Sequence, residues 1–170
     1  ERVIQELLKE AGAEEVSQTV ENPAYENYAR TPETYLGHER IKNFASPEKI
    51  VLNAVSQYTL PQYLPRNGVA YEGEWTVMNE YASPKKGSVL EINFEAKEVF
   101  LVMRPKSDTG QVKVLVDGSV QSLGKDVEDG IVTIDADTLY RLIELSLPGR
   151  HTLRLEFLDG NVEVYAFTFG

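Results

Sequence analysis

The chain contains no cysteine among its 170 residues, only two histidines and one tryptophan, and no long apolar run. Without cysteine there is no disulfide framework, no thiol nucleophile and no zinc site built on thiolates. The same absence leaves the redox compartment undetermined by composition. The apolar runs stay well below the roughly 18 residues that a membrane-spanning helix needs, which argues against a spanning segment.

Basic residues are also scarce. The chain has 17 Lys and Arg against 27 Asp and Glu, which gives a formal net charge of -10 at pH 7. Phosphate backbones and anionic membrane surfaces are bound by clustered lysines and arginines. We therefore expect no nucleic-acid partner and no membrane contact.

Patterns that would carry catalysis or metal binding are missing as well. His38 and His151 are far apart, and neither has the neighbours of a Ser-His-Asp triad. The acidic residues at 126–129 lack the regular spacing of a dedicated calcium loop, and the glycines form no phosphate-binding loop before a helix. Acidic residues are plentiful, but sequence alone shows neither the separation nor the burial that a glycosidase pair requires. The sequence predicts no catalytic residue, no metal site and no cofactor.

The first eleven residues follow a helical pattern. Apolar residues recur at three-to-four spacing over residues 1–11, and Gly12 suits the position just past a helix end. So short a helix is marginal in water, so it needs a partner surface. Residues 13–29 are acidic and are broken at Asn22-Pro23, which predicts a linker or a docked arm. A chain that opens inside a helix pattern is expected to be a piece of a longer protein.

Residues 30–67 are predicted to form an irregular arm. Pro32, Pro47, Pro61 and Pro65 interrupt this segment, and each lacks a donor N–H and restricts the residue before it. Ser46 and Pro47 suit the start of a helical turn that runs into residues 50–52. A short strand over residues 50–58 is the alternative, and the sequence does not separate the two.

Residues 68–170 have the pattern of a β-sandwich. Apolar and polar residues alternate at period two over 90–95 and 153–157, as in half-buried strands. Eight strands are predicted: 69–82, 88–95, 98–104, 111–117, 131–135, 138–145, 150–158 and 161–169. Four dipeptides mark turns between them: Asp117-Gly118, Asp129-Gly130, Pro148-Gly149 and Asp159-Gly160. With no helix between the strands, the pattern predicts a mostly β, antiparallel sandwich of jelly-roll type.

Three short motifs in order resemble a known domain. They are Arg30 to Gly37 (RTPETYLG), Gly73 to Trp75 (GEW) and Tyr165 to Gly170 (YAFTFG). They resemble the C-terminal domain that follows a thioredoxin domain in DipZ-like thiol-disulfide oxidoreductases. The resemblance implies that residues 1–29 are the last helix of that thioredoxin domain plus a linker. It also implies a fold similar to carbohydrate-binding modules, an extracytoplasmic location in the periplasm or at the cell surface, and a link to cytochrome c biogenesis.

The resemblance implies an accessory role. The chemistry of that family lies in a CxxC motif of the thioredoxin domain, so this chain is not expected to be an enzyme. The first hypothesis is a domain that positions a substrate protein or braces the preceding thioredoxin domain. The alternative is a module that targets the parent enzyme to an envelope glycan, and a free-standing hydrolase is a distant third. A row of aromatics on the exposed sheet favours sugar, whereas a flat polar face favours protein contact.

Aromatic residues are the candidate contacts for a ligand. Trp75 shares one strand face with Val77 and Tyr81, opposite a mostly polar face, which predicts that it lies in the core and is no sugar platform. Most tyrosines of the arm are expected to attach it to the sandwich. A minority is expected to line a groove, and Tyr35 with Tyr63 or Tyr71 is the first choice.

The C-terminal strand is predicted to be central. At period two, Tyr165, Phe167 and Phe169 share one face, opposite a second face that is also largely apolar. Such a strand is most stable where both of its edges are paired.

Overall fold

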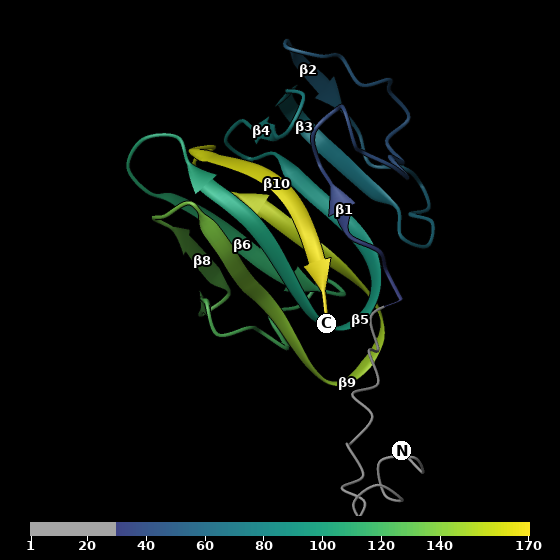
Figure 1. The fold of residues 1–170 in the computed structure, drawn as a ribbon, viewed down its shortest axis with the longest axis vertical. Helices are drawn as coiled ribbons and strands as arrows, with labels where there is room; N and C mark the ends of the chain where they lie inside the picture. The colour runs from purple at the N-terminus through teal and green to yellow at the C-terminus, as the bar shows by residue number, and fades with distance from the viewer. Residues whose placement is uncertain (1–29) are drawn as a thin grey trace, which may run out of the picture.

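The computed structural model describes residues 30–170, and Figure 1 shows their fold. In this part of the chain all strand pairs are antiparallel and no residue is helical. The ten strands are β1 (Thr34–Tyr35), β2 (Val55–Tyr58), β3 (Val69–Val77), β4 (Ala82–Pro84), β5 (Val89–Pro105), β6 (Gly110–Val116), β7 (Val127–Glu128), β8 (Ile131–Ile134), β9 (Thr138–Phe157) and β10 (Val162–Phe169). The antiparallel, mostly β fold is confirmed. The helix predicted over 1–11 and the linker or docked arm predicted over 13–29 lie outside the described residues.

Strands β5 and β9 are the two longest strands of the sandwich. Each is continuous over a region where the sequence predicts two separate strands. They pair with one another from Val89 and Glu156 to Met103 and Thr138, with register shifts near Ala96 and Val99. At these shifts both strands fold back, which Figure 1 shows at the lower end of the molecule. Residues 96–97 and 146–149 are breaks between strands in the sequence prediction. Strand pairing passes through them because the extra residues of a bulge bend a strand without ending it.

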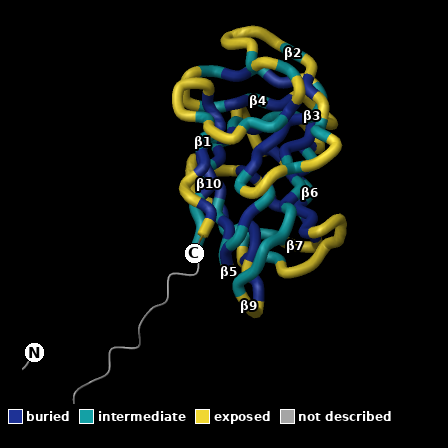
Figure 2. The backbone as a smooth tube through the Cα atoms, turned by 90° about the vertical axis from the view of Figure 1, so that its right-hand side faces the viewer, coloured by how far each residue is buried: buried dark blue, intermediate teal, exposed yellow. Residues whose placement is uncertain are grey.

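The bend places two layers face to face. The first layer, called the β6 layer, consists of β3, residues 89–96 of β5, residues 149–157 of β9, then β6, β8 and β7. The second, called the β10 layer, consists of β1, β10, residues 98–105 of β5 and residues 138–144 of β9. Strand β4 pairs with both β3 and β10 and so joins the layers. Buried residues lie mainly in the strands, and exposed segments gather in the connections (Figure 2).

The hairpin turns follow the Asp-Gly dipeptides. Asp129 and Gly130 both have positive φ, 50° and 80°, and they join β7 to β8 as a two-residue turn, which favours Asp-Gly. Asp159-Gly160 lies between β9 and β10 as predicted. The turn predicted at Pro148-Gly149 is wrong, since both residues lie within β9 near its bend.

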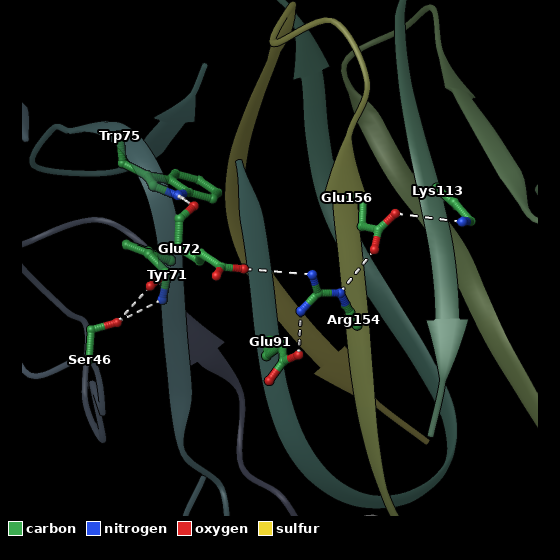
Figure 3. Close-up of polar contacts among 8 residues, drawn as sticks. All are labelled: Ser46, Tyr71, Glu72, Trp75, Glu91, Lys113, Arg154 and Glu156. Carbon is green, nitrogen blue, oxygen red and sulfur yellow. Dashed lines mark hydrogen bonds and ion pairs between the residues drawn. The ribbon is translucent and has the colours of Figure 1, made fainter. Parts of the chain in front are cut away.

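The arm of residues 30–67 contains two short strands and no helix. Of the two alternatives for residues 46–58, a short strand is the one observed, as β2 over Val55–Tyr58. Ser46 is buried, and its hydroxyl bonds the backbone of Tyr71, where it donates to the carbonyl and accepts from the N–H at 2.9 Å each (Figure 3). A side chain that suits a helix cap is used here to fix the arm on β3.

Strand β10 is central in its layer, with β5 on one side and β1 and β4 on the other. A bulge between Val164 and Ala166 changes the phase of the pleat. Phe167 is fully buried, whereas Tyr165 is half-buried and points elsewhere. The predicted single face of Tyr165, Phe167 and Phe169 is therefore broken at Tyr165.

Candidate functional site

Trp75 lies in the core, as predicted. Its side chain is fully buried, its indole N–H donates to the carbonyl of Glu72 at 3.0 Å, and its ring stacks on Tyr71 (Figure 3). Phe157 packs edge-on against it, with ring centroids 5.3 Å apart. A ring enclosed on these sides has no face left for a ligand.

The three tyrosines proposed from the sequence lie in different surroundings. Tyr71 is fully buried, its hydroxyl donates to the carbonyl of Leu36 at 2.7 Å, and burial raises its pKa well above the usual range. Its ring is out of reach of a ligand, and it attaches the arm to the sandwich. Tyr63 is 74% exposed and lines none of the hollows described below. Tyr35 lines a hollow, and ligand contact by Tyr35 or Tyr63 remains a prediction.

The hollow beside Tyr35 lies where β1, β10 and the turn between β3 and β4 meet. Its volume is about 230 Å³. We call it the tyrosine hollow, and its walls are formed by Tyr35, Gly37, Glu39, Arg40, Asn79, Glu80, Tyr165 and Ala166. The register pairs Tyr35 with Ala166, so both side chains project from the same face of the β10 layer.

Close backbone packing holds the walls of the tyrosine hollow. The N–H groups of His38 and Glu39 donate to the carbonyls of Met78 and Asn79 at 2.8 and 3.0 Å. Gly37, which directly precedes these two residues, crosses over the turn, and a Cβ at this position would lie within 3.0 Å of backbone atoms of residues 79–81. The glycine of the RTPETYLG segment is needed here because only a residue without a Cβ permits this approach.

Tyr35 is held in place from two sides. Its hydroxyl donates to Glu33 at 2.7 Å, and this bond raises the pKa of the phenol. The guanidinium of Arg40 lies 3.4 Å above the centre of the ring, in a cation–π stack. The ring and the guanidinium therefore form one planar stack on the wall of the hollow.

Tyr165 is fixed by a second cluster on the opposite wall. Its hydroxyl donates to Glu163 at 3.0 Å, and Arg104 donates to the same carboxylate at 2.7 Å. Partial burial, followed by the bond to Glu163, raises the pKa of Tyr165 well above the usual range. Tyr81 packs beside Tyr165 with ring centroids 5.4 Å apart, and Arg104 lies over both rings. The bulge in β10 makes this possible, because it turns Tyr165 out of the core.

The rim of the tyrosine hollow carries groups of both signs. Glu39, Arg40, Asn79 and Glu80 are exposed. None of the three charged residues forms an ion pair within residues 30–170. Carboxylates accept hydrogen bonds, a guanidinium donates them, and an amide does both. The site can therefore bond a ligand that carries donors and acceptors side by side.

The outer face of the β6 layer has a different character. Arg154 of β9 forms ion pairs with three carboxylates: Glu91 of β5 at 2.8 Å, Glu156 of its own strand at 3.0 Å and Glu72 of β3 at 3.6 Å (Figure 3). Lys113 of β6 lies 3.6 Å from Glu156, which extends the row across the layer.

Further along the same face, Arg150 pairs with Glu95 and donates to the side-chain carbonyl of Asn93 at 3.0 Å. We call the whole row, from Glu72 and Lys113 to Arg150, the charged face. The central strands β5 and β9 present here a lattice of charged and polar side chains and no row of aromatics.

The described residues offer no cluster for a metal ion. No group of three or more His, Asp or Glu within 30–170 is arranged to hold one. Asp126, from the acidic stretch considered for calcium, accepts the backbone N–H of Arg141 at 2.7 Å. This carboxylate has a structural role as a loop anchor. None of the residues in 30–170 forms a helix that is long and apolar enough to span a membrane.

Most of the tyrosine hollow was not identified from the sequence. Tyr35 was named, but Arg40, Asn79, Glu80 and Tyr165 were not. These residues meet through the crossing of the arm over the β3–β4 turn, and no local pattern records that contact. The bulge at Tyr165 could not be predicted from the sequence either, because strict alternation assigns this residue to the core.

Comparison with known families gives one match that spans most of the chain. Residues 31–170 match the family described as "Thioredoxin like C-terminal domain". No curated protein matches the chain.

Solved structures with a similar fold come from carbohydrate-active enzymes. An active-site mutant of a family two carbohydrate esterase from Clostridium thermocellum, in complex with a cellohexaose ligand, is 19% identical, with a TM-score of 0.51 over 62% of this chain and 32% of that chain. A family two carbohydrate esterase from Cellvibrio japonicus is 10% identical, with a TM-score of 0.41 over 83% of this chain and 32% of that one. The chain thus spans about a third of the length of these structures. At such identity the likeness shows the fold alone.

Proposed function

Since the chain belongs to the thioredoxin-like C-terminal domain family, we propose that it is a non-catalytic accessory domain of an extracytoplasmic, DipZ-like thioredoxin-family protein. It positions a substrate protein for the redox domain or braces that domain. Its partners in this proposal are the preceding thioredoxin domain of the same protein and the substrate protein. The nucleophile of thiol-disulfide exchange is a thiolate, and the chain has no cysteine that could supply one.

The charged face is the observation that carries this proposal. A lattice of alternating charges complements a protein surface of matching pattern, and such complementarity supplies specificity and faster association. Small ligands instead bind in concave, largely apolar sites. The face spans β3, β5, β9 and β6, so a folded partner can contact several strands at once.

The test compares two substrates of the parent oxidoreductase. Lys113→Glu reverses a charge at the end of the lattice, where the lysine is half-exposed and away from the core. We expect a raised KM for reduction of a disulfide-bonded protein and an unchanged rate with the small disulfide 5,5'-dithiobis(2-nitrobenzoic acid). Two proteins are compared with the unchanged parent: this variant and a parent that lacks residues 30–170. If both reduce the protein substrate and the small disulfide as fast as the unchanged parent, substrate positioning is contradicted.

The isolated chain supplies the control for the chemistry. We expect no reduction of insulin by residues 1–170, because disulfide exchange requires a thiolate. Turnover by pure chain would overturn the accessory role altogether.

A glycan-binding module is the second candidate, and the tyrosine hollow is the observation that favours it. Two fixed tyrosine rings, an amide and two carboxylates line one concave site. In that case the domain targets its parent to an envelope polysaccharide.

A further inference from the structure

We propose that the tyrosine hollow binds a neutral saccharide, with the ring of Tyr165 as its apolar wall and Arg40, Asn79 and Glu80 as its hydrogen-bonding rim. The inference rests on the second candidate function and names its site and ligand class. It does not depend on the charged face, which lies on the other layer.

The dimensions of the site suit one sugar ring within a longer chain. The hollow measures about 230 Å³, below the range of about 300 to 1,000 Å³ typical of sites for drug-sized ligands. A second hollow, of about 370 Å³, shares Tyr35, Glu39 and Arg40 with it. A third, of about 320 Å³, shares Glu39, Asn79 and Glu80. The site therefore continues on two sides, where neighbouring sugar units of an oligosaccharide find room.

The aromatic walls are ordered before any ligand arrives. Glu33 and Arg40 fix Tyr35, and Glu163 and Arg104 fix Tyr165. A ligand that stacks on a ring held in this way loses little side-chain entropy on binding. The apolar C–H face of a pyranose is the complement of such a ring, while its hydroxyls project sideways to the polar rim.

The charges of the rim select against an anionic ligand. Among the residues that line the tyrosine hollow, two carboxylates, those of Glu39 and Glu80, face one guanidinium, that of Arg40. A phosphate or a uronate would meet more negative than positive charge in the hollow. A neutral ring with adjacent hydroxyls donates to the carboxylates and accepts from Arg40 and Asn79 at the same time.

Arg40 has a specific place in this arrangement. Its guanidinium stacks on Tyr35 and makes no ion pair within the described part of the chain, so no carboxylate there competes for its N–H groups. A planar guanidinium presents five donors in fixed directions. Stacking on the ring sets these directions before a sugar binds.

Nuclear magnetic resonance titration of the full 170-residue chain tests the proposal. The probes are cellohexaose and mannohexaose as neutral sugars, a hexagalacturonate as an anionic sugar, and reduced, carboxymethylated lactalbumin as an extended polypeptide. We expect a neutral hexasaccharide to shift the backbone amides of Tyr35, Gly37, Asn79 and Tyr165. The amides of β7 and β8, at the far end of the β6 layer, should stay in place.

Matched variants separate binding from folding. Tyr165→Ala should weaken neutral sugar binding about fivefold or more, the usual effect of one aromatic contact, and Tyr165→Phe should weaken it less, because the ring remains and only the bond to Glu163 is lost. Arg40→Gln should also weaken neutral sugar binding about fivefold, as expected when one charge-assisted hydrogen bond is lost. Arg66→Gln is the control and should leave binding unchanged, because Arg66 is exposed and lies outside the three hollows. Melting curves show which variants are folded.

Each remaining outcome overturns the inference. Shifts with hexagalacturonate alone would reject the neutral class, and shifts with lactalbumin alone would assign the hollow to a polypeptide. Sugar-induced shifts confined to residues outside the hollow would place the site elsewhere. No shift with either neutral probe at 10 mM, about the upper limit of a weak Kd of interest, would remove saccharide binding from this hollow while leaving protein contact through the charged face intact.

Discussion

The rings of Tyr71 and Trp75 stack with centroids 4.3 Å apart and planes 15° from parallel, although four residues of a regular strand span about 13 Å. Gly73 lies midway between them with φ of 85°, and pairing of β3 changes there from β5 to β2 and β4. The strand bends at this glycine, and the two side chains lean together in the core. The GEW motif thus has a structural meaning, since its glycine creates the bend that brings its tryptophan onto Tyr71.

Removal of Trp75 should destabilise the whole sandwich. Trp75→Ala deletes a fully buried indole that contacts Tyr71 and Phe157, and such large-to-small changes cost about 3 to 5 kcal/mol in free energy of unfolding. Urea denaturation measures the loss. Tyr63→Ala is the control, because an exposed tyrosine should change stability by less than about 0.5 kcal/mol. A change below about 1 kcal/mol for Trp75→Ala would contradict the core role.

Gly37→Ala should disrupt the tyrosine hollow locally. The new methyl group meets backbone atoms of the β3–β4 turn, which cannot rotate away as a side chain can, and overpacking of this kind costs about 1 to 3 kcal/mol. The amide signals of His38 and Glu39 should shift, since their bonds to Met78 and Asn79 are pushed apart.

Gly87→Ala is the control for that substitution. A Cβ at Gly87 meets no atom within 4 Å, so the variant bears only the strain of its positive φ, about 1 to 2 kcal/mol. The signals of residues 37–39 should not move in Gly87→Ala. If both variants leave these signals unchanged, the crossing at Gly37 is looser than the structure shows.

The strand pattern of the sandwich could be predicted from the sequence because period-two alternation and Asp-Gly turns are local. Residues 111–117 and 161–169 were placed within one residue of β6 and β10. The continuity of β5 and β9 could not be predicted, since the bulges that carry pairing past residues 96–97 and 146–149 depend on the partner strand. The short strands β1 and β7 were missed because two residues are too few to show a period, whereas β2 lies within the strand that was one of the two alternatives for residues 50–58.

The site was less predictable than the fold for the same physical reason. Tyr35 could be proposed as a ligand contact because it is an aromatic residue in an irregular arm. Its partner Arg40, and Tyr165 on the opposite wall, are brought to it by the Gly37 crossing and by the bulge in β10. Both features depend on contacts between segments far apart in sequence, and alternation alone places Tyr165 in the core.

The charged face should make stability depend on pH in the acid range. The pKa of Glu156 is lowered, first by its hydrogen bond from Arg154. A carboxylate whose folded pKa lies below its unfolded value of about 4.3 stabilises the protein above that value, and the contribution is lost as pH falls through the folded pKa. The free energy of unfolding should therefore fall from pH 7 to pH 3.

Glu156→Gln checks this assignment, because a side chain that does not titrate removes its share of the pH dependence. We expect urea midpoints of the variant to fall less between pH 7 and pH 3 than those of the unchanged chain. Asp117 should also contribute stability that is lost as the pH falls. Partial burial opposes its ionisation, yet bonds from His151 and from the N–H of Thr152 lower its pKa. An identical slope for Glu156→Gln would show that Arg154 does not hold this carboxylate in solution.

Deletion of Tyr165 to Gly170 should abolish the fold. The segment forms most of β10, which pairs with β5 along one edge and with β1 along the other. Phe167 is fully buried, and Phe169 packs against the core and stacks near Phe94. Loss of this segment leaves backbone groups of β1 and β5 unpaired and opens the space that its large side chains fill in the full chain.

The expected loss can be compared with the stability of an ordinary domain. Truncation of one large aromatic core residue costs about 3 to 5 kcal/mol, and a typical domain is stable by about 5 to 15 kcal/mol. The deletion removes Phe167, Phe169 and the pairing of a central strand together, so the shortened chain should show no cooperative melting transition. The substitution Thr168→Ser changes a half-buried polar residue of the same strand and should still melt cooperatively. A truncated chain that melts cooperatively near the temperature of the full chain would show that β10 is peripheral, and the position of Tyr165 in the hollow would then have no structural basis.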